Sequence, residues 1–469
     1  MISRIVGNKG KLFSILCMLA IVNASVFSEV GSDGSDLTSR MEGMEMSEPK
    51  EFHPINATSK SFHWILTLFI LLILPSISAV FAYANQFHWS LILQFISTGY
   101  SVFEVLFLPF PDNTDNHENR TSHGTSWFLT ILLAITVFVG TFINGSNLIL
   151  NKFYPKLAAE GNSFGGVFFP RVYKTLSTLT TLTGWVRVSL APVALLGFCY
   201  GKHTGQCIAH GIMGTSFVFY GFVLSLVLVI PWIRKKQILS PESGSHSQEF
   251  YDSTLMCVWG IVNTFTEHRW GVEGWSHGDY QHTAMGIIWW AGGLLGMWQT
   301  RKRNNTRSFI PALLLIFTGW AMSEHSQHLK ISTKVHAMFG IALMSAGVSR
   351  IVEISFVLWD KNCSENGQIY SFQYFPPFCL VLSGVLFMSA TEEQLVLVND
   401  LGADHSSYIL VASSAAFVIF LWMQILLYLY LRLVGYDENG ELGFNGLDQE
   451  YQRAAQEFEL SDLSDHENN

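Results

Sequence analysis

The sequence predicts an all-α, polytopic integral membrane protein with about eleven transmembrane helices after a cleaved signal peptide. Its 469 residues are 49% hydrophobic and only 13% charged, and the mean hydropathy is +0.30. A soluble domain carries about 25% charged residues, so this composition excludes a soluble fold. Long apolar runs recur along the whole chain, as in proteins whose helices cross a bilayer. The expected partner is therefore lipid, and no basic stripe indicates nucleic acid.

The N-terminus has the features of a secretory signal peptide. Residues 1–28 read "MISRIVGNKGKLFSILCMLAIVNASVFS", with a basic start, a short apolar core and small residues near position 24. This pattern predicts cleavage and a mature N-terminus in the lumen or outside the cell. A polar segment, residues 29–62, follows it.

The apolar segments and the positive charges together predict the topology. One segment, 251–266, is short and polar, but counting it as a span leaves twelve Lys and Arg in the inner loops and five in the outer loops. The C-terminus is then cytosolic. The expected spans are 63–84, 88–110, 127–150, 176–198, 208–230, 251–266, 281–299, 309–324, 335–359, 372–390 and 407–433.

A basic cytosolic loop, 151–174, divides the expected spans into two groups. An N-terminal three-helix unit covers 63–150, and a C-terminal eight-helix domain covers 175–433. The remaining segment, 434–469, is an acidic tail that we expect to be disordered in the cytosol. From Asp437 onward it holds ten acidic residues and one Arg, so it accounts for the whole net charge of −9. We recognise no internal repeat at this level.

Two further features agree with this orientation. The sequons at Asn56 and Asn119 both fall on the expected outer side, where N-glycosylation occurs. Cys199 and Cys207 flank one short outer loop, where an oxidising compartment allows a disulfide.

Histidines are distributed unevenly across the predicted membrane. Of sixteen, thirteen lie outside or at outer helix ends. Because imidazole ligates transition metals and haem iron, convergence of several in one leaflet predicts a shared site. The other interpretation is that each His simply tolerates the wet interface. The expected ligands for haem b or a copper, iron or zinc ion are His210, His282 and His336, with His63, His325 and His328 as alternatives.

Four ionisable residues fall inside expected spans. Burying a charged side chain in lipid is costly, so such residues are usually paired or functional. Glu104 and Arg187 lie in different spans and form either a structural pair or a functional one. Arg350 and Glu353 are spaced i, i+3 near the inner end of a span. We expect Arg350 to extend toward the cytosolic face.

Three long segments carry a family resemblance. They read "GQCIAHGIMGTSFVFYG", "TEHRWGVEGWSHGDYQHTAMGIIWWAGGLLGMW" and "FTGWAMSEHSQHLKISTKVHAMFG". They resemble the C-terminal region of the fungal Ytp-type membrane proteins, an uncharacterised polytopic family, over about residues 160–435. The resemblance implies the same fold and topology.

The N-terminal stretch "FHWILTLFILLILPSISAVFAYANQFHWSLILQF" is similar to the other half of that family. It also loosely resembles transmembrane b-type cytochromes, with His63, Pro75 and His88 at the corresponding positions. Such cytochromes hold two haems with a His pair in each leaflet. Here only His88 is available on the inner side, which argues against two haems.

Enzyme motifs are absent from the sequence: it contains no phosphate-binding Gly loop, no HExxH and no GxSxG. The sequence predicts redox (electron-transfer) or metal handling at a His-lined site near the outer face, and leaves open whether the protein is an enzyme. One alternative is a non-catalytic scaffold or trafficking protein whose acidic tail binds a cytosolic partner. Another is a small-solute transporter that depends on Arg187 and Glu104. The expected location is the Golgi, endoplasmic reticulum, vacuole or plasma membrane.

Overall fold

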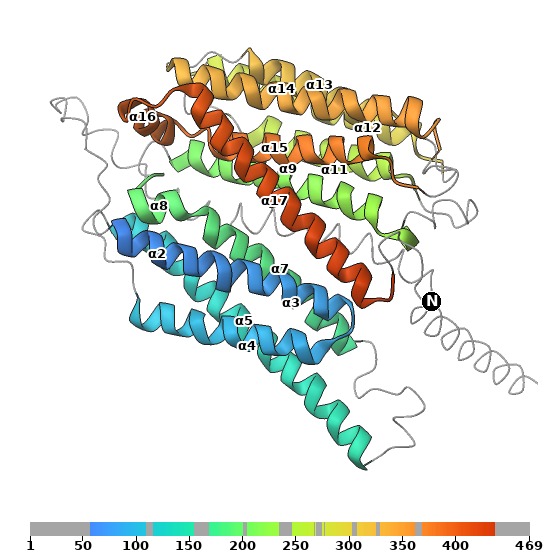
Figure 1. Cartoon of the computed structure of the whole chain (residues 1–469). Coiled ribbons are helices and arrows are strands. Elements are labelled where there is room, and N and C mark those ends of the chain that lie inside the picture. Colours follow the sequence, from blue (N-terminus) through green and yellow to red (C-terminus); the bar gives the residue numbers. More distant parts are fainter. Residues whose placement is uncertain are drawn as a thin grey trace, which may run out of the picture. The chain divides into compact units, whose positions relative to one another are not determined.

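The elements of the chain are helices throughout the part that the computed structural model describes (Figure 1), which confirms the all-α class. The predicted signal peptide, most of the polar segment after it, most of the basic loop and the tail from Asp437 lie outside that part. The described residues are 57–108, 116–153, 168–199, 204–233, 246–266, 268, 274–275, 277–302, 307–324, 329–361 and 368–436.

The chain divides into two compact units, which we treat separately. The N-terminal unit comprises 53–207, 229–231 and the chain from Phe417 onward. The fourth expected span, 176–198, thus belongs with the first three. The helices of this unit are α2 (Ala57–Leu68), η3 (Phe69–Ile73), α3 (Leu74–Tyr83), α4 (Phe87–Phe107), α5 (Asn116–Phe153), α7 (Phe168–Ser189) and α8 (Ala191–Leu196).

A π-helical turn, η3, joins α2 and α3 into one span. Pro75 has no N–H, so the carbonyl of Leu71 cannot receive its usual bond from four residues ahead. The helix widens there, and the Leu74 N–H bonds the Phe69 carbonyl five residues back. Gly184 on α7 packs against the Leu71 carbonyl so closely that a Cβ would overlap it. This close approach positions α7 against the first span.

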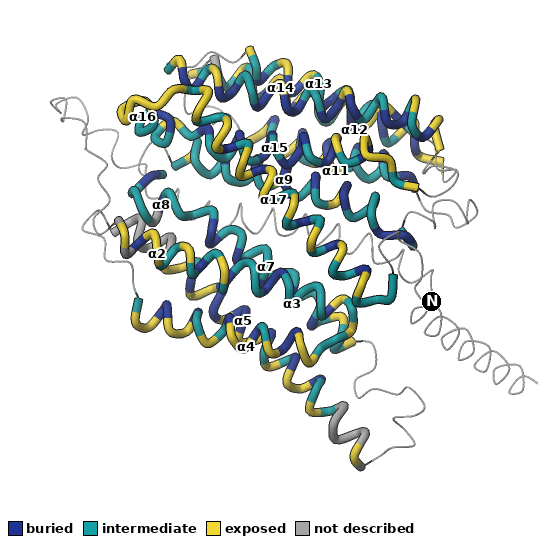
Figure 2. Tube along the Cα trace, in the orientation of Figure 1, coloured by how far each residue is buried: buried dark blue, intermediate teal, exposed yellow. Residues whose placement is uncertain are grey.

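The C-terminal unit comprises the described parts of 208–228 and 232–416. Buried positions recur along the helices of this unit (dark blue in Figure 2). Its larger apolar cluster surrounds Phe217, Phe339, Leu343 and Phe387. A smaller one holds Ile331, Val335, Ala390 and Leu395. Its helices are α9 (Thr204–Val229), α11 (Gln248–Thr266), α12 (His277–Gln299), α13 (Ile310–Ser323), α14 (Lys330–Val352), η5 (Glu353–Val357), η6 (Ser371–Tyr374), α15 (Phe375–Met388), α16 (Glu392–Asp400) and the first part of α17 (His405–Leu433).

Every expected span lies on a described helix. Among the described residues, seven helices are long and apolar enough to cross a membrane, and α13 is a shorter apolar helix. The expected spans 176–198, 251–266 and 281–299 lie on α7–α8, α11 and α12, which are more polar. The count of eleven spans therefore stays a prediction. One element is new: the short helix α16 occupies the expected outer loop 391–406.

Candidate functional site

Two of the predicted histidines meet inside the C-terminal unit. His210 lies in the second turn of α9 and His336 in the second turn of α14. Their ring centroids are 5.8 Å apart with the planes nearly perpendicular at 86°. Both residues are buried, with exposed fractions of 7% and 2%. Phe387 of α15 stacks on the His210 ring with a centroid separation of 4.4 Å. The sequence therefore identified a pair that converges from positions 126 residues apart.

The orientation of His336 is set from within its own helix. Its Nδ1 lies 2.9 Å from the backbone carbonyl of Ser332, one turn earlier. A proton on Nδ1 donates to that carbonyl, and this tautomer carries its lone pair on Nε2. His282 interacts electrostatically with His336. Its own backbone carbonyl accepts a hydrogen bond from Asn263 of α11 at 2.9 Å.

These three histidines head a repeated pattern, His-x3-Gly-x6-Gly. The repeat was not recognised from the sequence, although its spacing is readable there. A helical turn spans 3.6 residues, so the His and both Gly fall near one face of each helix. The three copies are His210, Gly214 and Gly221 in α9, His282, Gly286 and Gly293 in α12, and His336, Gly340 and Gly347 in α14.

Each copy packs in the same way against an antiparallel neighbour, namely α15, α11 and α13 respectively. The first Gly meets a partner Gly, so a Cβ on it would crowd the partner's backbone. The second Gly packs on a carbonyl seven residues before that partner Gly. The partner glycine and the residue that supplies the carbonyl are Gly384 and Pro377 for α9, Gly260 and Ser253 for α12, and Gly319 and Ala312 for α14. The C-terminal unit is thus built from three equivalent helix pairs, and the three histidines occupy equivalent positions.

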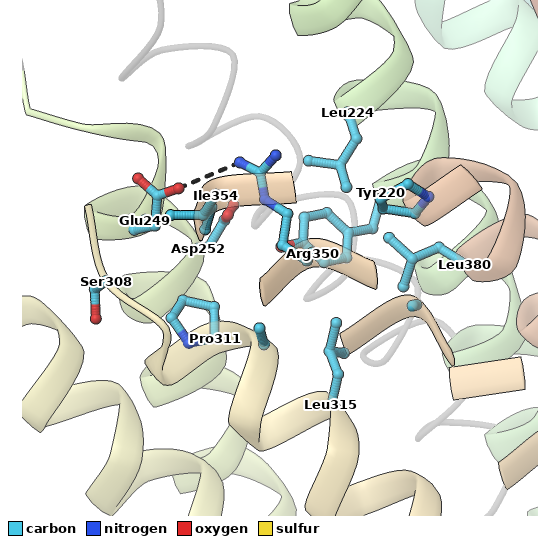
Figure 3. Close-up of a pocket in the computed structure, with 13 residues that line it drawn as sticks. Tyr220, Leu224, Glu249, Asp252, Ser308, Pro311, Leu315, Arg350, Ile354 and Leu380 are labelled. Carbon is cyan, nitrogen blue, oxygen red and sulfur yellow. Dashed lines mark hydrogen bonds and ion pairs between the residues drawn. The ribbon is translucent and has the colours of Figure 1, made fainter. Parts of the chain in front are cut away.

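A second polar site lies at the other end of the same helices (Figure 3), where charged side chains line a small cavity. Arg350 of α14 donates to Glu353 at 2.6 Å and to Glu249 of α11 at 3.2 Å. Arg307 also pairs with Glu249 at 3.2 Å. Burial lowers the pKa of Arg307, and the Glu249 carboxylate opposes that shift. Where the sequence predicts that Arg350 extends to the aqueous face, its guanidinium has protein partners instead.

The N-terminal unit holds a third buried group of charges. Glu104 Oε1 lies 2.8 Å from Nε2 of His63 and accepts a 2.8 Å bond from Arg187. The hydroxyl of Thr67 is 3.5 Å from the same oxygen. Exposed fractions of 2% for Glu104 and 1% for Arg187 make this an ion pair inside the helix bundle. The structure pairs Glu104 with Arg187 and adds His63, which the sequence had placed with the histidine site.

The remaining predicted residues are distributed as follows. Cys199 and Cys207 form a disulfide with a Cα–Cα distance of 5.5 Å. Asn119 lies in α5. Asn56, His325 and His328 lie outside the described residues. Within the described part of the chain, no group of three or more His, Cys, Asp and Glu is arranged to hold a metal ion.

Long apolar helices with ion pairs buried between them define a multi-pass α-helical membrane protein. Residues 183–431 match the family described as "Protein YTP1-like, C-terminal". The chain belongs to this YTP1-like family.

Three relatives support the assignment. Protein YTP1 of Saccharomyces cerevisiae is 52% identical over 412 residues, covering 87% of this chain and 86% of that protein. An uncharacterised membrane protein of Schizosaccharomyces pombe is 26% identical over 56% of this chain and 58% of its own length. A further uncharacterised membrane protein of Saccharomyces cerevisiae is 24% identical over 43% and 40%. No solved structure matches the chain.

Proposed function

We propose that the protein binds a transition-metal ion between His210 and His336, at the end of the C-terminal unit that the predicted topology places outside the cytosol. The main support for this proposal is the buried pair of imidazole rings of His210 and His336, whose centroids are 5.8 Å apart. Two imidazoles from different helices in an apolar core offer lone pairs to one small ion, and imidazole suits zinc, copper and iron. His282, equivalent to the other two in the repeat, is the proposed third ligand.

An ion fits this environment better than a haem does. Phe387 covers one face of the His210 ring, and Phe339 packs beside Phe387 with ring centroids 4.6 Å apart. A porphyrin would have to displace these rings, whereas a single ion occupies far less space. Three protein ligands with an open fourth position are typical of zinc sites that exchange or activate a bound molecule. Haem b is retained as the alternative cofactor.

The experiment is metal retention by the purified full-length protein. After chelation, the protein in detergent is loaded with Zn²⁺ or, under reductant, Cu⁺, and bound metal is counted by elemental mass spectrometry. We expect about one ion per chain in the wild type and a loss of most of it in His210→Ala and His336→Ala. His88→Ala, an exposed histidine of α4, is the matched control and should bind normally.

Two outcomes would count against this proposal. Wild-type protein that retains no stoichiometric metal, or four proteins that retain equal amounts, removes the ion site. A Soret band in the absorption spectrum of the purified protein would show that the site holds haem and not a metal ion.

A second candidate function, transport of a small solute, is favoured by one observation. Glu104, His63 and Arg187 form a buried, hydrogen-bonded group within membrane-spanning helices. Such groups line proton and solute pathways in transporters. Proton flux into vesicles that contain the protein and a trapped pH-sensitive dye tests it. Flux that Glu104→Gln leaves unchanged contradicts a pathway through this group.

The location in the cell is part of the proposal. The protein is integral to a membrane, and we place it in the endomembrane system or the plasma membrane with its N-terminus away from the cytosol.

A further inference from the structure

On α9 and α14, the lining residues of the cavity in Figure 3, which we call the carboxylate cavity, stand ten or more positions from the histidine pair, about 15–21 Å of helix. It is lined by Tyr220 of α9, Glu249 and Asp252 of α11, and Arg350 of α14, with apolar side chains around them. His210 and His336 stand near the opposite ends of α9 and α14. The cavity therefore needs an explanation separate from metal binding.

The charges around the cavity do not balance. Glu249, Asp252 and Glu353 supply three carboxylates, and Arg307 and Arg350 supply two guanidiniums, which leaves one negative charge. Glu249 and Glu353 are each bonded to an arginine, so their charges are compensated. Asp252 carries the remaining charge: the amide of Gln248 donates to it at 3.4 Å, and Tyr220 lines the same cavity.

The space and the unused oxygen at this site both suit a very small ligand. The cavity volume is about 10 Å³, roughly the room that one water molecule needs. Glu249 is only 2% exposed, and its Oε2 has no hydrogen-bond partner in the part of the chain that the structure describes. A buried carboxylate oxygen that lacks a donor is costly. A water molecule or a shared proton at this position would satisfy it.

We propose that the carboxylate cavity is a proton-binding site and that Asp252 is the residue that takes up and releases the proton. The carboxylate of Asp252 accepts a proton from hydronium, leaving water, and the cluster goes from one net negative charge to none. A metal cation suits the site less well, since the guanidinium of Arg350 lines the same cavity and would repel it.

Charged and titratable groups face Asp252 from each element packed around it. Tyr220 of α9 lines the same cavity, and on α11 itself Glu249 lies about one turn away. From α14, Arg350 also lines the cavity, but Glu249 and Glu353 already engage its guanidinium. A buried carboxylate that lacks an arginine of its own is the group in this cluster that gains most from taking up a proton.

Infrared difference spectroscopy of the purified full-length protein tests this proposal. As the pH is lowered, the wild type should develop the carbonyl band of a protonated carboxylic acid at a pH above about 4, where an exposed aspartate is still ionised. Asp252→Asn, which keeps the shape of the side chain, should remove that band. Asp404→Asn is the matched control, because Asp404 is a fully exposed carboxyl in the loop before α17 whose own pKa is lowered by hydrogen bonds from Ser407. It should leave the band in place.

Tyr220→Phe provides a second measurement that does not depend on the folding of the Asn variant. Loss of a hydroxyl that lines the same cavity makes the surroundings less polar and weakens the ionised form, so proton affinity should rise roughly tenfold, a shift of about one pH unit upward. A wild type without that band, or a band that persists in Asp252→Asn, overturns the proposal. A band that sodium chloride suppresses and choline chloride does not would identify a metal-cation site instead and also overturn it.

Discussion

His336 and Arg350 stand fourteen residues apart on α14, which separates the two polar sites of the C-terminal unit by about 21 Å along one helix. Between them, Phe339, Leu343 and Ala346 are buried in the apolar cluster with exposed fractions of 1%, 0% and 1%. Side chains pack in such cores at the density of organic crystals, so this apolar cluster separates the two sites.

The helix pairs that carry the histidines should tolerate no side chain at their crossing points. Gly340→Ala places a Cβ against the carbonyl of Gly319, and we expect a loss of about 1–3 kcal/mol because the backbones must separate. The measurement is thermal unfolding in detergent, followed by tryptophan fluorescence.

Gly99→Ala is the control for that variant. Apart from the adjoining stretch of its own helix, nothing in the described part of the chain lies within 4 Å of the position that its Cβ would occupy. Alanine is a better helix former than glycine by up to about 1 kcal/mol, so this variant should melt at the same temperature or higher. Equal destabilisation of both variants would refute a tight crossing at Gly340.

Removing one partner of the ion pair between Glu104 and Arg187 should lower the free energy of unfolding. Glu104→Gln leaves the buried guanidinium of Arg187 without its counter-charge, for an expected cost of about 3–5 kcal/mol. Replacing both residues by Leu should cost less than the two single Leu changes combined. Thermal unfolding measures all four proteins, and Asp400→Asn, on the exposed end of α16, is the neutral comparison. Strict additivity would show that the two side chains do not interact.

Local patterns predicted most of the fold. Hydropathy located most of the helices, because burial in lipid demands long apolar runs and satisfied backbones. The charge difference between loops found even the polar segment now seen as α11. The position of histidines at helix starts predicted the pair of His210 and His336, since helices of similar length bring their starts to similar depths.

The features that could not be predicted depend on contacts between residues far apart in the sequence. Arg350 reaches Glu249 across 101 positions, and no spacing rule connects an arginine near the end of one helix with a glutamate near the start of another. Likewise, His63 was grouped with the other histidines by its helix-start position, yet it bonds Glu104. The glycine repeat is different: its spacing was present in the sequence, and only the packing gave it meaning.

The disulfide should stabilise the loop before α9 and protect both cysteines from alkylation. Cys199 and Cys207 close a short loop, so Cys207→Ser should cost about 2–3 kcal/mol. Maleimide labelling without denaturant should modify neither residue until a reductant is added. Cys379→Ser, a buried free thiol, is the control for general effects of cysteine replacement. Labelling of Cys199 in unreduced wild type would contradict the bridge.

Glycosylation offers a direct test of the predicted topology, because several sequons fall on opposite sides. Glycosidase treatment should increase the gel mobility of the wild type, and Asn119→Gln should remove part of that shift. Asn304 and Asn362 also begin sequons, in loops that the topology places in the cytosol. Glycopeptide mass spectrometry should find them unmodified, and a glycan on either would invert the orientation.

Deleting the acidic tail separates metal binding from the scaffold interpretation. Truncation after Tyr436 removes the segment that carries the net charge of −9. The proposed metal ligands all belong to the C-terminal unit, so the truncated protein should retain metal and melt as the full chain does. Complementation of a strain that lacks the protein then distinguishes a metal-binding function from a scaffold that acts through the acidic tail. A metal-binding function requires that His282→Ala with His336→Ala fails and that the truncation succeeds. The reverse result would make the tail the functional element, because a scaffold depends on the surface that its partner binds and not on a buried histidine pair.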